Sequence, residues 1–110
     1  MKQYEKLWLE RLNELINNNI TNVDFQLTDI SIALGISRAK LYRLLMKLTG
    51  QAPSDYIRNK RLSKAYEILN RGVYPTVKET AAAVGFRQPE HFTRVFFKEY
   101  DILPSELLRQ

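Results

Sequence analysis

The second half of this chain repeats the pattern of the first half, and this internal repeat constrains the fold more than any other feature of the sequence. The tripeptide Ala33-Leu34-Gly35 returns fifty positions later as Ala83-Val84-Gly85. The turn after the second glycine is one residue longer, so the later matches fall at a spacing of 51. These later matches pair Leu41-Tyr42-Arg43 with Phe92-Thr93-Arg94, Lys47 with Lys98, and Pro53-Ser54 with Pro104-Ser105. A repeat of this kind indicates two similar supersecondary units in succession.

Each copy of the repeat reads as a short helix, a turn at a glycine, a longer helix and a new helix start at Pro-Ser. Gly35 and Gly85 suit the left-handed conformation that a sharp turn after a helix requires. Two helices joined by such a turn form a helix-turn-helix, whose second helix can enter the major groove of DNA. A helical bundle of another kind can contain the same pattern, so the charge of the second helix has to discriminate between the two interpretations.

The rest of the chain is also helical in pattern, and no alternating strand pattern of useful length occurs, which predicts an all-α fold. We expect about seven helices, arranged as two helix-turn-helix subdomains joined by a long linker helix, a tandem of homeodomain-like units. The expected helices cover residues 4–18, 28–34, 37–49, 53–70, 76–84, 89–100 and a short segment from 104. The expected parts are an N-terminal amphipathic helix (1–24), the first helix-turn-helix (25–52), the linker helix (53–72) and the second helix-turn-helix (73–110).

The N-terminal helix carries an apolar stripe at helical spacing, made of Leu7, Trp8, Leu12, Leu15 and Ile16. A stripe of this kind has to be covered by another part of a protein. We expect it to pack on the first helix-turn-helix, and a connector or a dimer surface is the alternative.

The charge of the chain indicates a polyanionic partner. The sequence has 17 basic and 12 acidic residues, a formal net charge of +5, and its isoelectric point is near 9.6. Four basic residues lie on the second helix of the first copy with no acidic residue among them: Arg38, Lys40, Arg43 and Lys47. This distribution favours DNA binding over a bundle without a nucleic-acid partner.

Other classes of function find little support in the composition. Without any cysteine the chain cannot form a disulfide framework or a thiolate metal site, and no run of about 18 apolar residues is available to span a bilayer. His91 is the only histidine, which leaves no histidine metal site and no catalytic dyad. We therefore predict no enzyme activity, no cofactor, no metal and no small-molecule ligand in this domain, and a cytoplasmic location.

Both copies of the repeat resemble a known family, the AraC/XylS-type transcriptional regulators. The resemblance to its first unit lies in the run from Leu34 to Pro53, with Leu41-Tyr42-Arg43 and Gly50-Gln51-Ala52-Pro53. The resemblance to its second unit lies in Ala83-Val84-Gly85-Phe86, Phe92-Thr93-Arg94-Val95-Phe96 and Pro104-Ser105. The resemblance implies two recognition helices in successive major grooves of double-stranded DNA, and RNA polymerase as a further partner. Asp101 stands where the family usually has glycine, and aspartate tolerates left-handed geometry better than most residues.

Three features are similar to the DNA-binding end of hybrid two-component regulators: the Leu-Tyr-Arg run, the Leu-Thr-Gly-Gln-Ala-Pro turn, and Trp8-Leu9-Glu10 in the leading helix. This similarity implies sequence-specific DNA binding by a transcription regulator, an activator, that serves as the output domain of a two-component or hybrid sensor protein. The chain would then be the cytoplasmic part of a membrane-anchored sensor, and monomeric in isolation. A free-standing AraC-type regulator is the alternative, and a protein-interaction adaptor with a basic face is a further one.

The predicted DNA contacts of the first copy are Arg38, Ala39, Lys40, Tyr42, Arg43 and Lys47. An arginine fork can bind guanine O6 and N7, or a phosphate. Arg43 is expected to contact a base or the backbone, whereas Tyr42 either faces the groove or packs at the helix edge. Ala39 can offer only a methyl group, for instance to thymine. Arg58 and Arg61 on the linker helix are further predicted phosphate contacts.

The predicted DNA contacts of the second copy are Gln88, Glu90, His91, Thr93, Arg94 and Lys98. Glutamine suits adenine, and glutamate can accept a hydrogen bond from cytosine N4, although its charge also repels phosphates. Arg94 either contacts DNA or forms a structural ion pair, and His91 lies at the groove edge or packs. Because the second copy carries Glu90 and Asp101, we expect the first copy to bind DNA more strongly.

Overall fold

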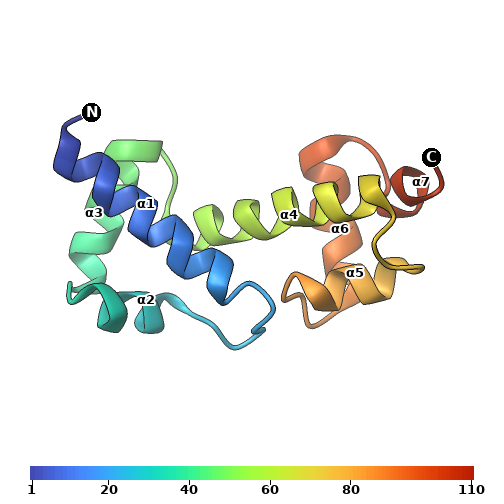
Figure 1. Ribbon diagram of the computed structural model, residues 1–110, viewed down its shortest axis with the longest axis horizontal. Helices are drawn as coiled ribbons and strands as arrows, with labels where there is room; N and C mark the ends of the chain where they lie inside the picture. The colour runs from blue at the N-terminus through green and yellow to red at the C-terminus, as the bar shows by residue number, and fades with distance from the viewer. The chain divides into compact units, whose positions relative to one another are not determined.

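The computed structural model describes all residues from 1 to 110, and Figure 1 shows that every regular element is a helix. The seven helices are α1 (Gln3–Asn18), α2 (Leu27–Leu34), α3 (Arg38–Thr49), α4 (Pro53–Arg71), α5 (Val77–Ala83), α6 (Pro89–Tyr100) and α7 (Pro104–Leu108). The prediction of an all-α chain with about seven helices is confirmed. No helix is long and apolar enough to cross a membrane.

The helix ends follow from individual side chains. Ser37 begins α3, because its hydroxyl accepts the Lys40 backbone N–H at 3.1 Å, and Thr76 begins α5 in the same way with the N–H of Glu79. These contacts satisfy donors that have no partner within the first turn of a helix. At the other end, α3 stops at Gly50 and α6 stops at Asp101, with φ angles of 73° and 57°. Asp101 therefore adopts the left-handed conformation that was expected for it.

The chain divides into two compact units. Unit 1 consists of Met1–Asn19 and Phe25–Asn59, and unit 2 consists of Ile20–Asp24 and Lys60–Gln110. Helix α4 contributes its first part to unit 1 and the remainder to unit 2. This division differs from the expected segmentation at two places, since the linker helix belongs to both units and residues 20–24 belong with the second copy of the repeat.

The core of unit 1 is built by all four of its helices. Its buried members are Leu12, Ile16, Phe25, Ile30, Leu41, Leu45, Tyr56 and Ile57. Leu12 and Ile16 belong to α1 and pack with residues of α2, α3 and the start of α4, and Trp8 and Leu15 are partly buried against the same cluster. Leu7, the remaining member of the predicted stripe, is 55% exposed. A side-chain hydrogen bond from the Tyr56 hydroxyl to Asn13 also joins α4 to α1.

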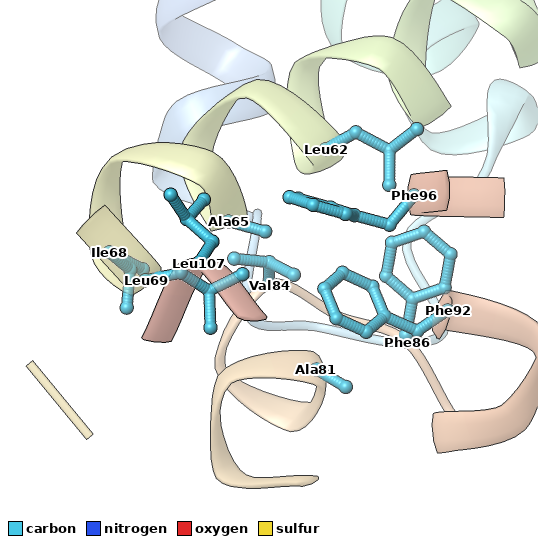
Figure 2. Packing of buried hydrophobic residues seen from close by; sticks show 10 residues of the cluster. All are labelled: Leu62, Ala65, Ile68, Leu69, Ala81, Val84, Phe86, Phe92, Phe96 and Leu107. Carbon is cyan, nitrogen blue, oxygen red and sulfur yellow. The ribbon is translucent and has the colours of Figure 1, made fainter. Parts of the chain in front are cut away.

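The core of unit 2 contains the phenylalanine rings of Phe86, Phe92 and Phe96, as Figure 2 shows. The ring centroids of Phe86 and Phe92 lie 5.1 Å apart in an edge-on geometry, and those of Phe92 and Phe96 lie 5.5 Å apart in a tilted one. Aromatic pairs prefer such geometries. The three rings pack with the α4 residues Leu62, Ala65, Ile68 and Leu69, together with Ala81, Val84 and Leu107. Tyr66 of α4 is 38% exposed and stacks on Phe96, with ring centroids 6.2 Å apart.

Candidate nucleic-acid interface

The outward side of α3 is defined by the two residues that it buries. Leu41 and Leu45 lie four residues apart and are almost completely buried, so the side chains on the opposite side of the helix face solvent. We call this opposite side the α3 face, and it consists of Ala39, Tyr42, Arg43 and Met46. Arg38 borders it on one side, and Lys40 and Lys47 border it on the other. All six residues predicted as DNA contacts in the first copy are therefore exposed.

Three of the four cations around the α3 face have no anionic partner within the chain. None of the five salt bridges involves Arg38, Lys40 or Arg43. An unpaired cation on an exposed helix is free to contact a phosphate or a base edge without first breaking an internal bond. The arrangement gives α3 three available donors on the side that a major groove would receive.

Lys47 is the exception among these cations. Its Nζ lies 2.9 Å from Oε2 of Glu5, whose side chain is only 5% exposed. The Lys2 backbone N–H donates to the other Glu5 carboxylate oxygen at 2.9 Å. That backbone hydrogen bond and, after it, Lys47 lower the pKa of Glu5, and the same pair raises the pKa of Lys47. Lys47 thus joins α3 to the start of α1, a role that the sequence analysis did not predict.

The outward side of α6 is set by the equivalent pair of buried residues, Phe92 and Phe96. We call the opposite side the α6 face, and it consists of Glu90, Thr93, Arg94 and Phe97, at the positions that Ala39, Tyr42, Arg43 and Met46 hold in the first copy. Of the predicted DNA contacts in this copy, Gln88, Glu90, His91, Arg94 and Lys98 are exposed and Thr93 is half-buried.

Arg94 already has a partner within α6. Its Nη2 lies 3.0 Å from Nδ1 of His91, one turn earlier on the helix. The His91 ring in turn lies against Phe86, with centroids 5.9 Å apart. No carboxylate pairs with Arg94, so of the two alternatives for this residue the structural ion pair is wrong. No cluster of three or more His, Cys, Asp or Glu side chains that could hold a metal occurs at His91 or elsewhere.

The prediction that Arg61 contacts phosphate is contradicted by its burial. Only 7% of this residue is exposed, and its guanidinium lies among backbone carbonyls of unit 2. Nη1 donates to the carbonyls of Ile20 at 2.6 Å and Val84 at 2.8 Å, and Nη2 donates to that of Asn22 at 3.1 Å. Burial lowers the pKa of Arg61. The side chain therefore binds residues 20–24 to α4 and to the turn after α5.

Gly85 makes room for this buried guanidinium. Its φ angle is 86°, and a Cβ atom on this residue would overlap Nη1 of Arg61 and lie 2.5 Å from the Ile20 carbonyl oxygen. Gly35, its counterpart in the first copy, has a φ angle of 67° but nothing within 4 Å of such a Cβ. The two glycines therefore share the turn, but only Gly85 is also required by a neighbouring side chain.

Arg58, the other predicted phosphate contact on α4, is exposed and pairs with Asp55 at 3.1 Å. The spacing of three residues between Asp55 and Arg58 places both on one side of the helix, so this pair was visible in the sequence. Exposed pairs of this kind contribute little to stability, and Arg58 can exchange Asp55 for a phosphate at small cost.

A family model described as a helix-turn-helix domain matches residues 30–110. Histidine kinase P4 of Formosa agariphila is 26% identical over 98 residues, which are 89% of this chain and 7% of that protein. The transcriptional activator RhrA of Rhizobium meliloti is 30% identical over 95 residues, 86% of this chain and 30% of RhrA. A solved structure of an AraC-type transcriptional regulator from Chromobacterium violaceum is 27% identical with a TM-score of 0.87, covering 99% of this chain and 96% of that one.

This chain belongs to the AraC-type helix-turn-helix family of DNA-binding transcription regulators. A helix-turn-helix domain of this family implies binding of double-stranded DNA, the kind of partner that the repeat and its basic second helix predicted. The family of this domain is non-enzymatic, which confirms the prediction of no enzyme activity for the domain itself. The chain spans less than a third of the length of either curated relative.

Proposed function

We propose that this domain recognises a specific sequence of duplex DNA mainly through α3. The observation that carries the proposal is the α3 face, where Arg43 stands among exposed side chains with no internal ion pair. Recognition helices place their N-terminal residues on base edges in the major groove. Arg38, Ala39, Lys40, Tyr42 and Arg43 lie in the first half of α3 and take this role. Lys47 exchanges Glu5 for a phosphate at the rim.

The second copy contacts DNA through α6 in an adjacent major groove. Glu90, Thr93 and Arg94 face outward or lie half-buried on the α6 face, with Gln88 and His91 at the start of the helix and Lys98 at its rim. This lobe contributes less to affinity, because Glu90 repels phosphates and Arg94 is held by His91. Half-sites one helical turn apart, about 34 Å, follow for two such helices on one face of DNA.

The regulator to which this domain belongs activates transcription. Support comes from similarity to an activator and from similarity to a small part of a histidine kinase. We propose that the domain is the output part of a two-component or hybrid sensor protein, that it works in the cytoplasm as a monomer when isolated, and that RNA polymerase is its second partner.

The test is selection of binding sites from random duplex DNA, followed by footprinting. A recurring motif under α3 is expected, with weaker protection about one turn away. Affinity should fall steeply between low and moderate salt, because bound phosphates release counterions. Binding without any motif would contradict sequence-specific recognition. If the domain bound a protein instead of DNA, with an affinity that does not depend on salt, the adaptor interpretation would be favoured.

A further inference from the structure

The middle of the α3 face is apolar although it faces solvent. Ala39, Tyr42 and Met46 follow one another at spacings of three and four residues, which places them in one line along the helix. Tyr42 is 52% exposed and Met46 is 40% exposed, and Ala39 is exposed as well. A line of apolar side chains between cations is not required to hold unit 1 together, because the core lies on the opposite side of the helix.

A hollow next to this line is also apolar. It has a volume of about 470 Å³ and is lined from α3 by Arg38, Ala39, Leu41, Tyr42 and Arg43, and from neighbouring elements by Leu27 and Pro53. All these residues belong to unit 1. The short side chain of Ala39 leaves space beside the Tyr42 ring one turn later, so a small apolar group can lie between them.

Thymine is the DNA base that presents such a group in the major groove. Its 5-methyl projects into the groove beside the O4 acceptor, and it is recognised by apolar contact with residues such as alanine. Arginine and lysine at the borders of the line supply phosphate and base contacts, but their charged donors form no hydrogen bond with a methyl group. The line therefore adds a kind of recognition that the cations around it lack.

The α6 face differs from the α3 face at the two positions that correspond to Ala39 and Tyr42. Glu90 occupies the place of Ala39, and Thr93 occupies that of Tyr42. A carboxylate next to a methyl group loses hydration without gaining a hydrogen bond. Phe97, at the place of Met46, is 45% exposed, but with Glu90 in place of Ala39 the α6 face lacks the apolar pair that Ala39 and Tyr42 form on α3.

We propose that α3 selects thymine through its 5-methyl group, which lies between Ala39 and Tyr42, with Ala39 setting the specificity. This inference rests on the proposed function, since it assumes that the α3 face enters the major groove. The same site accepts the methyl group of 5-methylcytosine, because the 5-substituent occupies the same place in the groove.

The test replaces thymine by deoxyuridine, which removes the methyl group and leaves every hydrogen-bonding atom in place. Each thymine of the selected site is replaced singly, and affinity is measured at fixed salt. One or two replacements under α3 should weaken binding about three- to fivefold, the effect expected for burial of one methyl group. Replacements under α6 should change affinity by less than about 1.5-fold, on the same reasoning.

Two variants connect this penalty to the named residues. In Ala39→Ser and in Tyr42→Ser the deoxyuridine penalty should fall to less than about twofold, because the methyl group loses an apolar neighbour. Ala33→Ser is the matched control, since Ala33 is an exposed alanine near the end of α2, in contact with Arg11 of α1. It should retain the full penalty. Circular dichroism of each variant checks that the fold is retained.

The possible results separate this inference from the function on which it rests. Failure to bind any duplex DNA would contradict the proposed function. Tight, sequence-specific binding that is unchanged on fully deoxyuridine-substituted DNA would overturn the methyl-reading inference alone. The inference is also overturned if the penalty persists at full size in both variants, or if the α3 half-site contains no thymine.

Discussion

Helices α3 and α6 have the same arrangement of buried residues but differ in the side chains that face outward. Each buries two side chains four residues apart, Leu41 and Leu45 or Phe92 and Phe96, and each ends at a left-handed residue. These buried pairs do not constrain which residues face outward, and Glu90 stands where the first copy has Ala39. Two lobes of one repeat can therefore carry different outward side chains without any difference in fold, because the buried residues that build each lobe and the outward residues are separate sets.

The two units also differ in the charge that they bury. Unit 1 buries the carboxylate of Glu5, which pairs with Lys47 on one side and accepts the Lys2 N–H on the other. Unit 2 buries the guanidinium of Arg61, which has only backbone carbonyls as partners. Loss of the guanidinium leaves the buried carbonyl of Val84 without this donor, whereas loss of the Glu5 carboxylate leaves Lys47, whose side chain is 63% exposed and can be hydrated. We therefore expect unit 2 to be the more sensitive to the loss of its charge.

The largest expected effect is that of Arg61→Met. Loss of a charged donor to three carbonyls should lower the free energy of unfolding by about 3 kcal/mol or more. Urea titration followed by circular dichroism measures the loss. Trp8, the single tryptophan, lies in unit 1 and reports on that unit by fluorescence, and its transition should lag behind the circular dichroism transition.

Arg58→Met is the matched control for Arg61→Met on the same helix. Its exposed pair with Asp55 is worth about 0.5 kcal/mol. If the two variants unfolded at the same urea concentration, the structural role of the Arg61 guanidinium would be refuted.

The second effect compares the equivalent glycines of the repeat. Gly35→Ala should cost about 1–2 kcal/mol from left-handed strain alone. Gly85→Ala has the same strain and also displaces the Arg61 guanidinium, so its cost should be larger by about 2 kcal/mol. Thermal or urea unfolding of both variants checks the order. In an Arg61→Met background the excess at Gly85 should shrink, and an excess of unchanged size would show that Arg61 is not its cause.

The third effect concerns DNA affinity. Arg43→Ala should weaken binding to the selected site by about 1–3 kcal/mol and relax specificity if the contact is to a base. Arg94→Ala should cost less than about 1 kcal/mol, because its partner His91 already holds the guanidinium. Fluorescence anisotropy at one salt concentration compares the two. Equal losses would contradict the unequal contribution of the lobes, and no loss at Arg43 would remove the residue from the proposed interface.

The smallest effect is the pH dependence of Glu5. Because the fold lowers the pKa of this carboxyl below its ordinary value of 4.5, its contribution to stability is present above that value and is lost as pH falls through the lowered one. Glu5→Gln should therefore be less stable than the natural chain near neutral pH and approach it in acid. Glu10→Gln on the same helix forms the control, since Glu10 is exposed and makes no salt bridge. A constant difference between Glu5→Gln and the natural chain across pH would be incompatible with this assignment.

The helix ends and the faces of α3 and α6 could be predicted because their causes are local. Ser37, Gly50 and Asp101 act within one turn of themselves, and buried positions recur at helical spacing. Arg61 could not be predicted, because Arg58, Lys60 and Arg61 look alike in sequence. Its burial depends on the carbonyl of Ile20, 41 positions away. The pair of Glu5 and Lys47 could not be predicted either, because its members lie far apart in the sequence. The pair of Asp55 and Arg58 could be predicted, because its members lie one turn apart on one helix.

The assignment of Ile20–Asp24 to unit 2 has a consequence for how such regulators can be recombined. The chain enters unit 2 briefly between α1 and α2, and returns to it only at Lys60, after the first two turns of α4. A fragment that starts at Pro53 would lack the carbonyls of Ile20 and Asn22, and Arg61 would keep one of its three acceptors. The second lobe therefore cannot be isolated as one continuous segment of the chain. A chimera that exchanges this lobe between relatives has to include the five residues Ile20–Asp24 as well.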